Sequence, residues 1–492
     1  MRKKIANLLM ALTLTAGFSS CGNSFLNTDY YNGTDLENGL TSVEKISTAL
    51  NGTYYDLYYY KFAGNYALNI ADIPTDISYW NGKTGHFNRI YTFTFTDTEV
   101  YLNDIWEYGY KTADNAARII EGIQALYDKV NEADKKKLDI YMAEAYALRG
   151  YAQLLLTNIF AHQIKVNGQD FSDEPGIVVI DKPIPAHSKV SRTTVGKSYE
   201  AVVGDFTNAI QHFENAKADR ETLIYLNKAA VYGLLARTYL YMEDWDNAIS
   251  YADKALKAKN ISTLTYGKEY KSLYNNSTSN KESFFALAIT QTNNWSANSS
   301  GTLWSTYNIS PSPKLQKLFG EQDCRTTIFD WSPKSTQETP IFAGGKFSHF
   351  DSGNAAYGTN YIVNAPEMFL ILAEANLKSS KGSLEHAKNA LLTVAKRNAA
   401  IQSVADLPAG KEELIKFLKD ERARELFQEG MRLYDLRRWD EKAEVYATGA
   451  PNVQFTYQDY QISKLVFPIP NAEINSGFGV EQNEWANTLP QR

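Results

Sequence analysis

The sequence predicts a mainly α-helical fold, in which paired helices form a scaffold that carries long irregular loops. Apolar and small side chains recur at helical spacing in several blocks. Long polar stretches rich in Asn, Gly, Ser, Thr and aromatic residues separate these blocks. With 44% hydrophobic and 22% charged residues, the chain has an ordinary globular balance. We therefore expect one large unit over residues 21–492, with an N-terminal half at 24–215 and a C-terminal half at 280–492.

The first twenty residues have the pattern of an export signal. Arg2, Lys3 and Lys4 form a short positive region, residues 5–17 are mostly apolar and uncharged, and two small residues precede Cys21. The apolar stretch is too short to span a bilayer comfortably. A cysteine at this boundary is typical of a bacterial lipoprotein signal, so we expect acyl chains on Cys21 to anchor the protein to a membrane. An ordinary cleaved signal peptide is the alternative.

The composition argues against nucleic acid as a partner. Loss of the signal removes three cations and no acids, so the formal net charge falls from −6 to −9. A mildly acidic chain without a basic tract does not suit a phosphate backbone. The 33 tyrosines and 8 tryptophans are a high aromatic content. Such side chains are typical both of a hydrophobic core and of a surface on which sugars stack. Cys324 has no partner once Cys21 is acylated, so we expect no disulfide.

The clearest helical pair is predicted over residues 228–256. Its apolar and small positions fall on two helical faces, separated by a turn at 243–245. They are Tyr232, Leu235, Ala236 and Tyr239 before the turn, and Ala248, Ala252 and Ala255 after it. This spacing fits the tetratricopeptide helix-turn-helix, although Ala252 stands where a larger aromatic residue is usual. Similar stripes at 145–159, 368–375 and 387–394 predict further scaffold helices.

Three polar stretches are predicted to be loops that form a ligand face, at residues 72–98, 275–312 and 337–364. In the first two, aromatic rings stand beside Asp, Asn and Arg side chains. Such rings stack on the C–H face of a sugar, and the polar groups hydrogen-bond its hydroxyls. The predicted ligand-binding residues are Asp76, Trp80, Asn81, Arg89, Trp295, Asn298, Trp304 and Tyr307. For each tryptophan, local packing is the alternative.

The run from Glu421 to Trp439, ERARELFQEGMRLYDLRRW, predicts a charged helix that is tied into the fold. Its opposite charges recur three residues apart, as neighbours on a helix do. The expected pairs are Glu421–Arg424, Arg422–Glu425, Glu429–Arg432, Arg432–Asp435 and Asp435–Arg438. Gly430 would allow a bend. An acid–base role for Glu425 and Glu429 is disfavoured, because arginines within helical reach would hold both ionised.

Sequence motifs of catalysis are sparse. His-Glu-x-x-His and Gly-x-Ser-x-Gly do not occur, and six scattered histidines with one free cysteine predict no metal centre and no cofactor. Gly196-Lys197-Ser198 resembles a phosphate loop, but Ser191 stands where the first glycine of that loop is required. Carboxylates are abundant, so a glycosidase pair stays open.

Several motifs, in their order along the chain, resemble the SusD/RagB family of outer-membrane nutrient-binding lipoproteins. They are Phe25-Leu26, residues 49–55 (ALNGTYY), 114–120 (DNAARII), 143–151 (AEAYALRGY) and 367–375, the run 421–439, and Phe467-Pro468-Ile469-Pro470 with Glu473-Ile474 and Gln482-Asn483. One departure is that Asn475-Ser476 replaces the asparagine-proline usual in the family after the Glu-Ile pair.

The resemblance implies a SusD-like α/α superhelix and a lipid-anchored protein on the outer membrane, facing the cell exterior. Such a protein binds an oligosaccharide or polysaccharide without turnover and delivers it to a SusC-like TonB-dependent transporter, which the helical scaffold contacts. The resemblance also places the sugar site in loops of the two regions that hold the predicted residues. A peptide-binding protein of the RagB type and a glycan-acting enzyme are the alternatives.

Overall fold

The structure is a computed structural model that describes residues 39–82, 84–307, 309–329 and 344–490, and it is mainly helical. The long helices are α2 (Val43–Tyr58), α5 (Val100–Leu126), α6 (Glu132–Phe160), α7 (Val195–Ala216), α8 (Lys228–Tyr241), α9 (Trp245–Ala258), α12 (Ala365–Lys378), α13 (Leu384–Ala395) and α14 (Lys411–Glu425). The short helices are α3 (Tyr66–Asn69), α4 (Asn88–Tyr91), α10 (Ser300–Ser305), α11 (Pro313–Leu318), α15 (Arg432–Arg438) and α16 (Asn471–Asn475). The predicted helical fold class is therefore confirmed, while Cys21 and the export signal lie outside the described residues.

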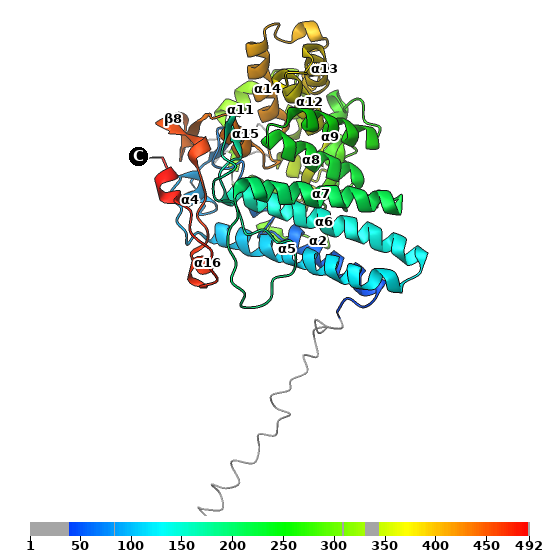
Figure 1. The fold of residues 1–492 in the computed structure, drawn as a ribbon. Helices are drawn as coiled ribbons and strands as arrows, with labels where there is room; N and C mark the ends of the chain where they lie inside the picture. Colours follow the sequence, from blue (N-terminus) through cyan, green and yellow to red (C-terminus); the bar gives the residue numbers. More distant parts are fainter. Residues whose placement is uncertain (1–38, 83, 308, 330–343, 491–492) are drawn as a thin grey trace, which may run out of the picture.

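The long helices form a layered stack (Figure 1). α5 packs on α6, α6 on α7, α7 on α8, α8 on α9, α9 on α12, and α12 on α13. Each inner helix buries side chains on two sides, which is why helices such as α6 and α12 are apolar or small at most positions. Among the described helices, none combines the length and the apolar character that a membrane crossing requires.

Helices α8 and α9 show how the local sequence sets this packing. The Asn227 side chain caps α8 by accepting a hydrogen bond from the Ala230 N–H at 3.0 Å. The Asp244 side chain starts α9 in the same way, by accepting from the Asn247 N–H at 3.2 Å. The alanines of α9 at 248, 252 and 255 are fully buried, so small residues let the two helices approach closely.

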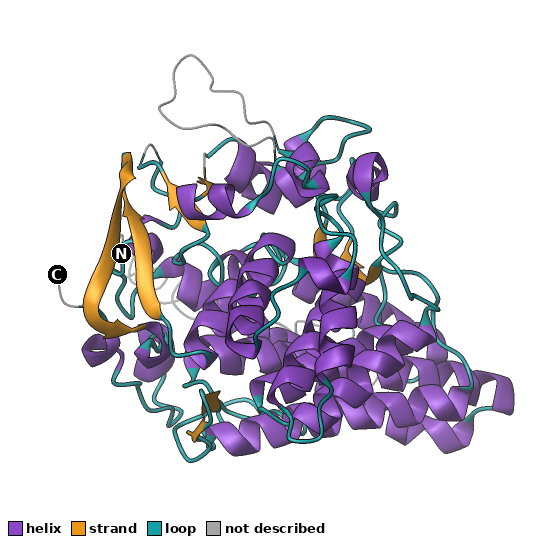
Figure 2. Ribbon diagram, turned by 90° about the horizontal axis from the view of Figure 1, so that it is seen from above, coloured by secondary structure: helices purple, strands orange, loops and turns teal. Residues whose placement is uncertain are grey.

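The strands form small antiparallel pairs outside the helical stack (Figure 2). The pairs are β1 (Ser78–Trp80) with β5 (Ile309–Pro311), β2 (Lys165–Val166) with β3 (Gln169–Asp170), β4 (Ser283–Leu287) with β6 (Asn360–Asn364), and β7 (Lys442–Ala447) with β8 (Ala450–Gln461). β1–β5 and β4–β6 join segments far apart in the sequence. They therefore fix the loops between the helices to one another.

The run 421–439 is not the single charged helix that the sequence predicts. α14 ends at Glu425 and α15 begins at Arg432, and the turn between them contains Gln428 and Gly430 at φ +66° and +70°. A Cβ on Gly430 would also lie 2.8 Å from the Leu68 carbonyl oxygen, so this turn requires glycine.

The turn changes the predicted charge pairs. Only two of them are present in the structure, Glu421–Arg424 and Asp435–Arg438. Most charged groups of the run are buried, and they form further pairs, either with another residue of the run or with residues elsewhere in the fold. The pairs are Arg422–Asp435 at 2.7 Å, Glu425–Arg325 at 2.9 Å, Glu429–Lys346 at 2.5 Å, Arg432–Asp76 at 2.8 Å and Arg438–Glu374 at 2.5 Å. We call these pairs the buried ion network.

The pair between Glu374 and Arg438 gives the first testable prediction. Burial alone would raise the pKa of Glu374, but the Arg438 guanidinium outweighs burial and lowers the pKa from 4.5 to about 2. Because the folded-state pKa is the lower one, the stabilisation is complete above about pH 5 and is lost as the pH falls toward 2. We expect Glu374→Gln to lower the free energy of unfolding by about 3 kcal/mol at neutral pH, and by much less near pH 3.

Urea denaturation at the two pH values measures this difference. The control is Glu385→Gln, because Glu385 is an exposed residue of α13. That variant should change the free energy of unfolding by less than about 1 kcal/mol at either pH. An equal loss at both pH values for Glu374→Gln would contradict the prediction.

Candidate functional site

The structure brings together the two loop regions in which the sequence predicts a ligand site. β1 pairs with β5, with Trp80 opposite Ile309 and Tyr79 opposite Ser310. Beyond these strands, the rings of His86 and Tyr307 stack at 3.9 Å with an angle of 18° between their planes. Partial burial lowers the pKa of His86, which favours a neutral ring in this stack. Residues more than 200 positions apart thus form one surface.

Three of the predicted ligand-binding residues are buried, and this corrects the prediction for them. Asp76 is bound by Arg432 and Lys314, each at 2.8 Å. Trp80 and Trp304 are 3% and 1% exposed. Burial opposes ionisation of Asp76, but the two cations outweigh it and hold its pKa well below the usual range. The two tryptophan rings therefore offer no open face to a solute.

The Trp304 ring is part of the core. Its Nε1 donates to Asn69 Oδ1 at 2.6 Å, and its ring meets Phe427 edge-on at 5.0 Å. Phe427 lies in the turn after α14, so Trp304 joins α10 to that turn. Its role in the structure is packing, which was the alternative considered for each tryptophan.

The other predicted residues reach the surface. Arg89 and Asn298 are exposed, and Asn81, Trp295 and Tyr307 are partly exposed. The Asn298 backbone carbonyl accepts a hydrogen bond from Asn65 Nδ2 at 2.8 Å, which holds this loop while its side chain stays exposed. Ligand binding by these five residues remains a prediction.

Trp295 lies in a cluster of tyrosines that the sequence reasoning missed. We call Tyr55, Tyr59, Tyr60, Tyr108 and Trp295 the aromatic surface. The Trp295 ring lies 5.5 Å from Tyr55, 4.8 Å from Tyr59 and 5.8 Å from Tyr60, and Tyr59 lies 4.7 Å from Tyr108. Tyr55 is 50% exposed. The signal in the sequence is the run YYDLYYY at 54–60, of which only Tyr54 and Tyr55 belong to the family motif at 49–55.

Backbone contacts fix the Trp295 ring in place. Its Nε1 donates to the Tyr58 carbonyl oxygen at 3.0 Å, and the Tyr58 hydroxyl donates to the Asn293 carbonyl oxygen at 2.6 Å. These two bonds join the end of α2 to the loop that carries Trp295. The ring is therefore held in one orientation before any ligand arrives, which lowers the entropy cost of binding.

Charged groups border the aromatic surface. Lys61 lies 3.2 Å from Asp104, and Lys111 lies 2.9 Å from Asp56. Both ammonium groups also lie over the Tyr108 ring, at 5.9 and 5.3 Å from its centre. Flat rings beside paired donors and acceptors suit a ligand with apolar C–H faces and several hydroxyl groups.

Further rings extend this surface toward the loop of His86. Tyr60 meets Tyr66 edge-on at 5.5 Å, Tyr66 meets Tyr101 edge-on at 4.7 Å, and Tyr101 stacks on Phe87 at 4.1 Å. Phe87 is buried, but the three tyrosines are partly exposed. The rings thus continue from the aromatic surface to Phe87, the residue that follows His86 in the sequence.

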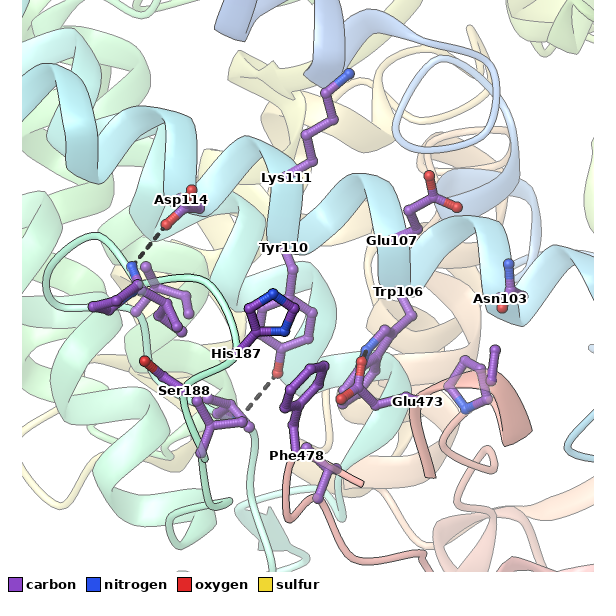
Figure 3. Close-up of a pocket in the computed structure, with 18 residues that line it drawn as sticks. Asn103, Trp106, Glu107, Tyr110, Lys111, Asp114, His187, Ser188, Glu473 and Phe478 are labelled. Carbon is purple, nitrogen blue, oxygen red and sulfur yellow. Dashed lines mark hydrogen bonds between the residues drawn. The ribbon is translucent and has the colours of Figure 1, made fainter. Parts of the chain in front are cut away.

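A separate pocket of about 520 Å³ lies between α5, the loop 178–190 and the segment 470–480 (Figure 3). Trp106, Tyr110, His187 and Phe478 contribute rings to it. Several polar groups are already engaged, since Trp106 Nε1 donates to Glu473 at 3.1 Å and the Tyr110 hydroxyl accepts from the Val178 N–H at 3.0 Å. This mainly apolar lining is less suited to a polyol than the aromatic surface is.

Two profiles of known protein families match the sequence. A family profile described as starch-binding associating with outer membrane matches residues 24–240, and one described as SusD family matches residues 346–485. No curated protein matches the sequence. Fold and surface together define a helical-repeat protein that presents aromatic side chains beside its scaffold. The chain belongs to the SusD/RagB family.

Solved structures share this fold at low sequence identity. A SusD superfamily protein from Bacteroides thetaiotaomicron has a TM-score of 0.78 at 21% identity, covering 90% of this chain and 99% of its own. A SusD-like carbohydrate binding protein from Bacteroides vulgatus has a TM-score of 0.69 at 20% identity, covering 82% and 85%. A SusD superfamily protein from Bacteroides fragilis has a TM-score of 0.72 at 19% identity, covering 92% and 99%.

The different burial of two tryptophans gives a second prediction. We expect Trp304→Ala to lower the free energy of unfolding by about 3–5 kcal/mol, because it empties a buried site and leaves Asn69 without its donor. Trp295→Ala should cost less than about 2 kcal/mol, because its ring is partly exposed. Urea denaturation of both variants measures the contrast, and equal losses would argue against these assignments.

Proposed function

We propose that the protein captures a glycan on the aromatic surface and releases it unchanged. The observation that carries this proposal is the Trp295 ring, which is held by the Tyr58 carbonyl and flanked by the half-exposed Tyr55. A rigid ring with a tyrosine beside it can stack on successive sugar faces. One solved relative with the same fold is itself described as a carbohydrate binding protein, which supports this ligand class.

Binding without turnover is part of the proposal. The carboxylates in the family's most specific run are engaged in buried ion pairs, as Glu421 and Glu425 are with Arg325. Burial opposes ionisation of Glu421, but Arg325 and Arg424 outweigh it and hold its pKa at about 2, so it keeps no proton to donate near neutral pH. This supports a structural role for the run and a binding role for the surface rings.

We further propose that the protein acts at the cell surface. The export signal and Cys21 support a lipid anchor on the outer membrane, and one matching profile describes an association with that membrane. In this proposal a SusC-like TonB-dependent transporter receives the glycan. The binding protein covers the transporter as a lid and contacts it through the helical scaffold. The resemblance of the sequence to the family supports this partner.

Binding to polysaccharides tests the function. We expect isothermal titration with amylopectin, xylan, mannan and galactan to show binding of at least one of them without release of new reducing ends. Trp295→Ala and Tyr55→Ala should each weaken that binding about tenfold, since truncating an aromatic anchor typically costs more than about 1 kcal/mol. Tyr232→Ala on α8, a tyrosine outside the aromatic surface, is the control and should bind normally.

Competition with a peptide mixture separates the glycan from the peptide alternative. Displacement by peptides at equal concentration, or unchanged affinity in both aromatic variants, would refute glycan capture on this surface. Release of reducing ends would instead establish a glycan-acting enzyme.

The anchor has its own test. We expect Cys21→Ala to move the protein from the membrane fraction to the soluble fraction and to abolish its labelling by a palmitate analogue, because the thiol that carries the acyl chains is lost. The wild-type chain is the matched control. Retention of the label or of membrane association in the variant would contradict lipidation at this residue.

A further inference from the structure

A groove with a volume of about 910 Å³ lies between α2 and α5, beside the aromatic surface. Small residues keep it open on both helices. They are Ala49, Gly52 and Thr53 on α2 and Ala125 on α5, whereas Leu40 covers Gly122. A Cβ added to Gly52 would meet no atom within 4 Å, so the space above this glycine is empty. The volume is at the upper end of the range for ligand sites in proteins.

Two residues belong to both the groove and the aromatic surface or its border. Tyr55, which faces Trp295 at 5.5 Å, also lines the groove. Lys111, which lies over the Tyr108 ring at 5.3 Å, lines the groove from the side of α5. A ligand stacked on Trp295 and Tyr55 therefore lies at the entrance of the groove.

The groove carries polar groups that suit sugar hydroxyls. Asp56 accepts from Asn115 Nδ2 at 2.8 Å and lies 2.9 Å from Lys111 Nζ. The Lys111 side chain is 50% exposed, so its ammonium group can donate a hydrogen bond to a ligand while it stays paired with Asp56. Arg118 is held by Asp114 at 2.7 Å and lines the groove further along α5. Fixed donors thus follow one another along the α5 wall.

We infer that the groove and the aromatic surface form one continuous site for an extended glycan chain. Sugar residues stack on Trp295 and Tyr55, and the chain continues past Lys111 between α2 and α5. This inference rests on the proposed function and deepens it, because it names a polymer of several sugar residues as the ligand class. Short oligosaccharides fill only the aromatic part of the site.

Filling the groove at Gly52 tests this inference. Gly52→Leu places an apolar side chain over Ala49, because helical side chains lean toward the preceding turn. Leucine has a higher helix propensity than glycine, and no atom lies within 4 Å of a Cβ at this position. We therefore expect the fold to persist. Gly204→Leu is the matched control, because Gly204 is a glycine of α7 that also has no atom within 4 Å of an added Cβ.

The probes are amylopectin, xylan, mannan and galactan, each compared with its own trisaccharide. We expect Gly52→Leu to weaken binding of the preferred polysaccharide about tenfold and to leave the trisaccharide affinity unchanged, since only the long chain enters the groove. Gly204→Leu should bind both as the wild type does.

The outcomes separate this inference from the proposed function. If Gly52→Leu binds the polysaccharide normally while Trp295→Ala binds it weakly, the inference of a continuous site is wrong. The proposed capture of a glycan on the aromatic surface is then still supported. Equal weakening by Gly52→Leu and Gly204→Leu, or equal weakening for polysaccharide and trisaccharide, overturns the continuous site too. Normal binding by both Trp295→Ala and Tyr55→Ala, or no binding of any panel polysaccharide by the wild type, refutes the proposed function itself.

Discussion

The contact between the turn after α14 and the loop at residues 71–76 is the constraint on which the rest of the structure depends. Asp72 accepts hydrogen bonds from the backbone N–H groups of residues 430–432, each at 3.1 Å, and Leu433 N–H donates to the Ala71 carbonyl at 2.8 Å. Arg432 adds the pair with Asp76. Burial raises the pKa of Asp72 to about 6, although the backbone donors favour its charged form. The buried charges are costly by themselves, so they persist only while the whole set is assembled.

This contact positions the candidate site. β1 begins two residues after the contact at 71–76, and it pairs with β5. This pairing places the segment 293–307, which precedes β5, beside the end of α2. Trp295 then reaches the Tyr58 carbonyl. The position of the Trp295 ring therefore depends on contacts in the interior, and a ring that is held in place before binding loses less entropy when it binds. A break in the network would disturb the site without touching any ring in it.

Local sequence patterns predicted the scaffold better than the site. Helical periodicity and capping residues are local signals, so the helices at 228–256 and 365–395 follow from them. Three of the five charge pairs predicted within 421–439 were wrong. Because the chain turns at Gly430, Arg432 pairs with Asp76 and Glu429 pairs with Lys346 instead. Trp295 and Trp304 stand in the same predicted loop, 275–312, and only tertiary packing makes Trp304 buried and Trp295 partly exposed. The tyrosines around Trp295 could be grouped only from the structure, because helix periodicity does not show which loop packs against the end of a helix.

Helix α5 explains why several surface features meet in one place. Its 27 residues pass the aromatic surface at Tyr108, the groove at Lys111 and Asn115, and the apolar pocket at Trp106 and Tyr110. Because 3.6 residues make one helical turn, side chains three or four positions apart form one wall, and the intervening ones face another. A single rigid helix can thus hold stacking rings and hydrogen-bond donors in fixed register. Register of this kind suits a chain of repeating units better than a compact solute, because each repeat then meets the next group along the helix.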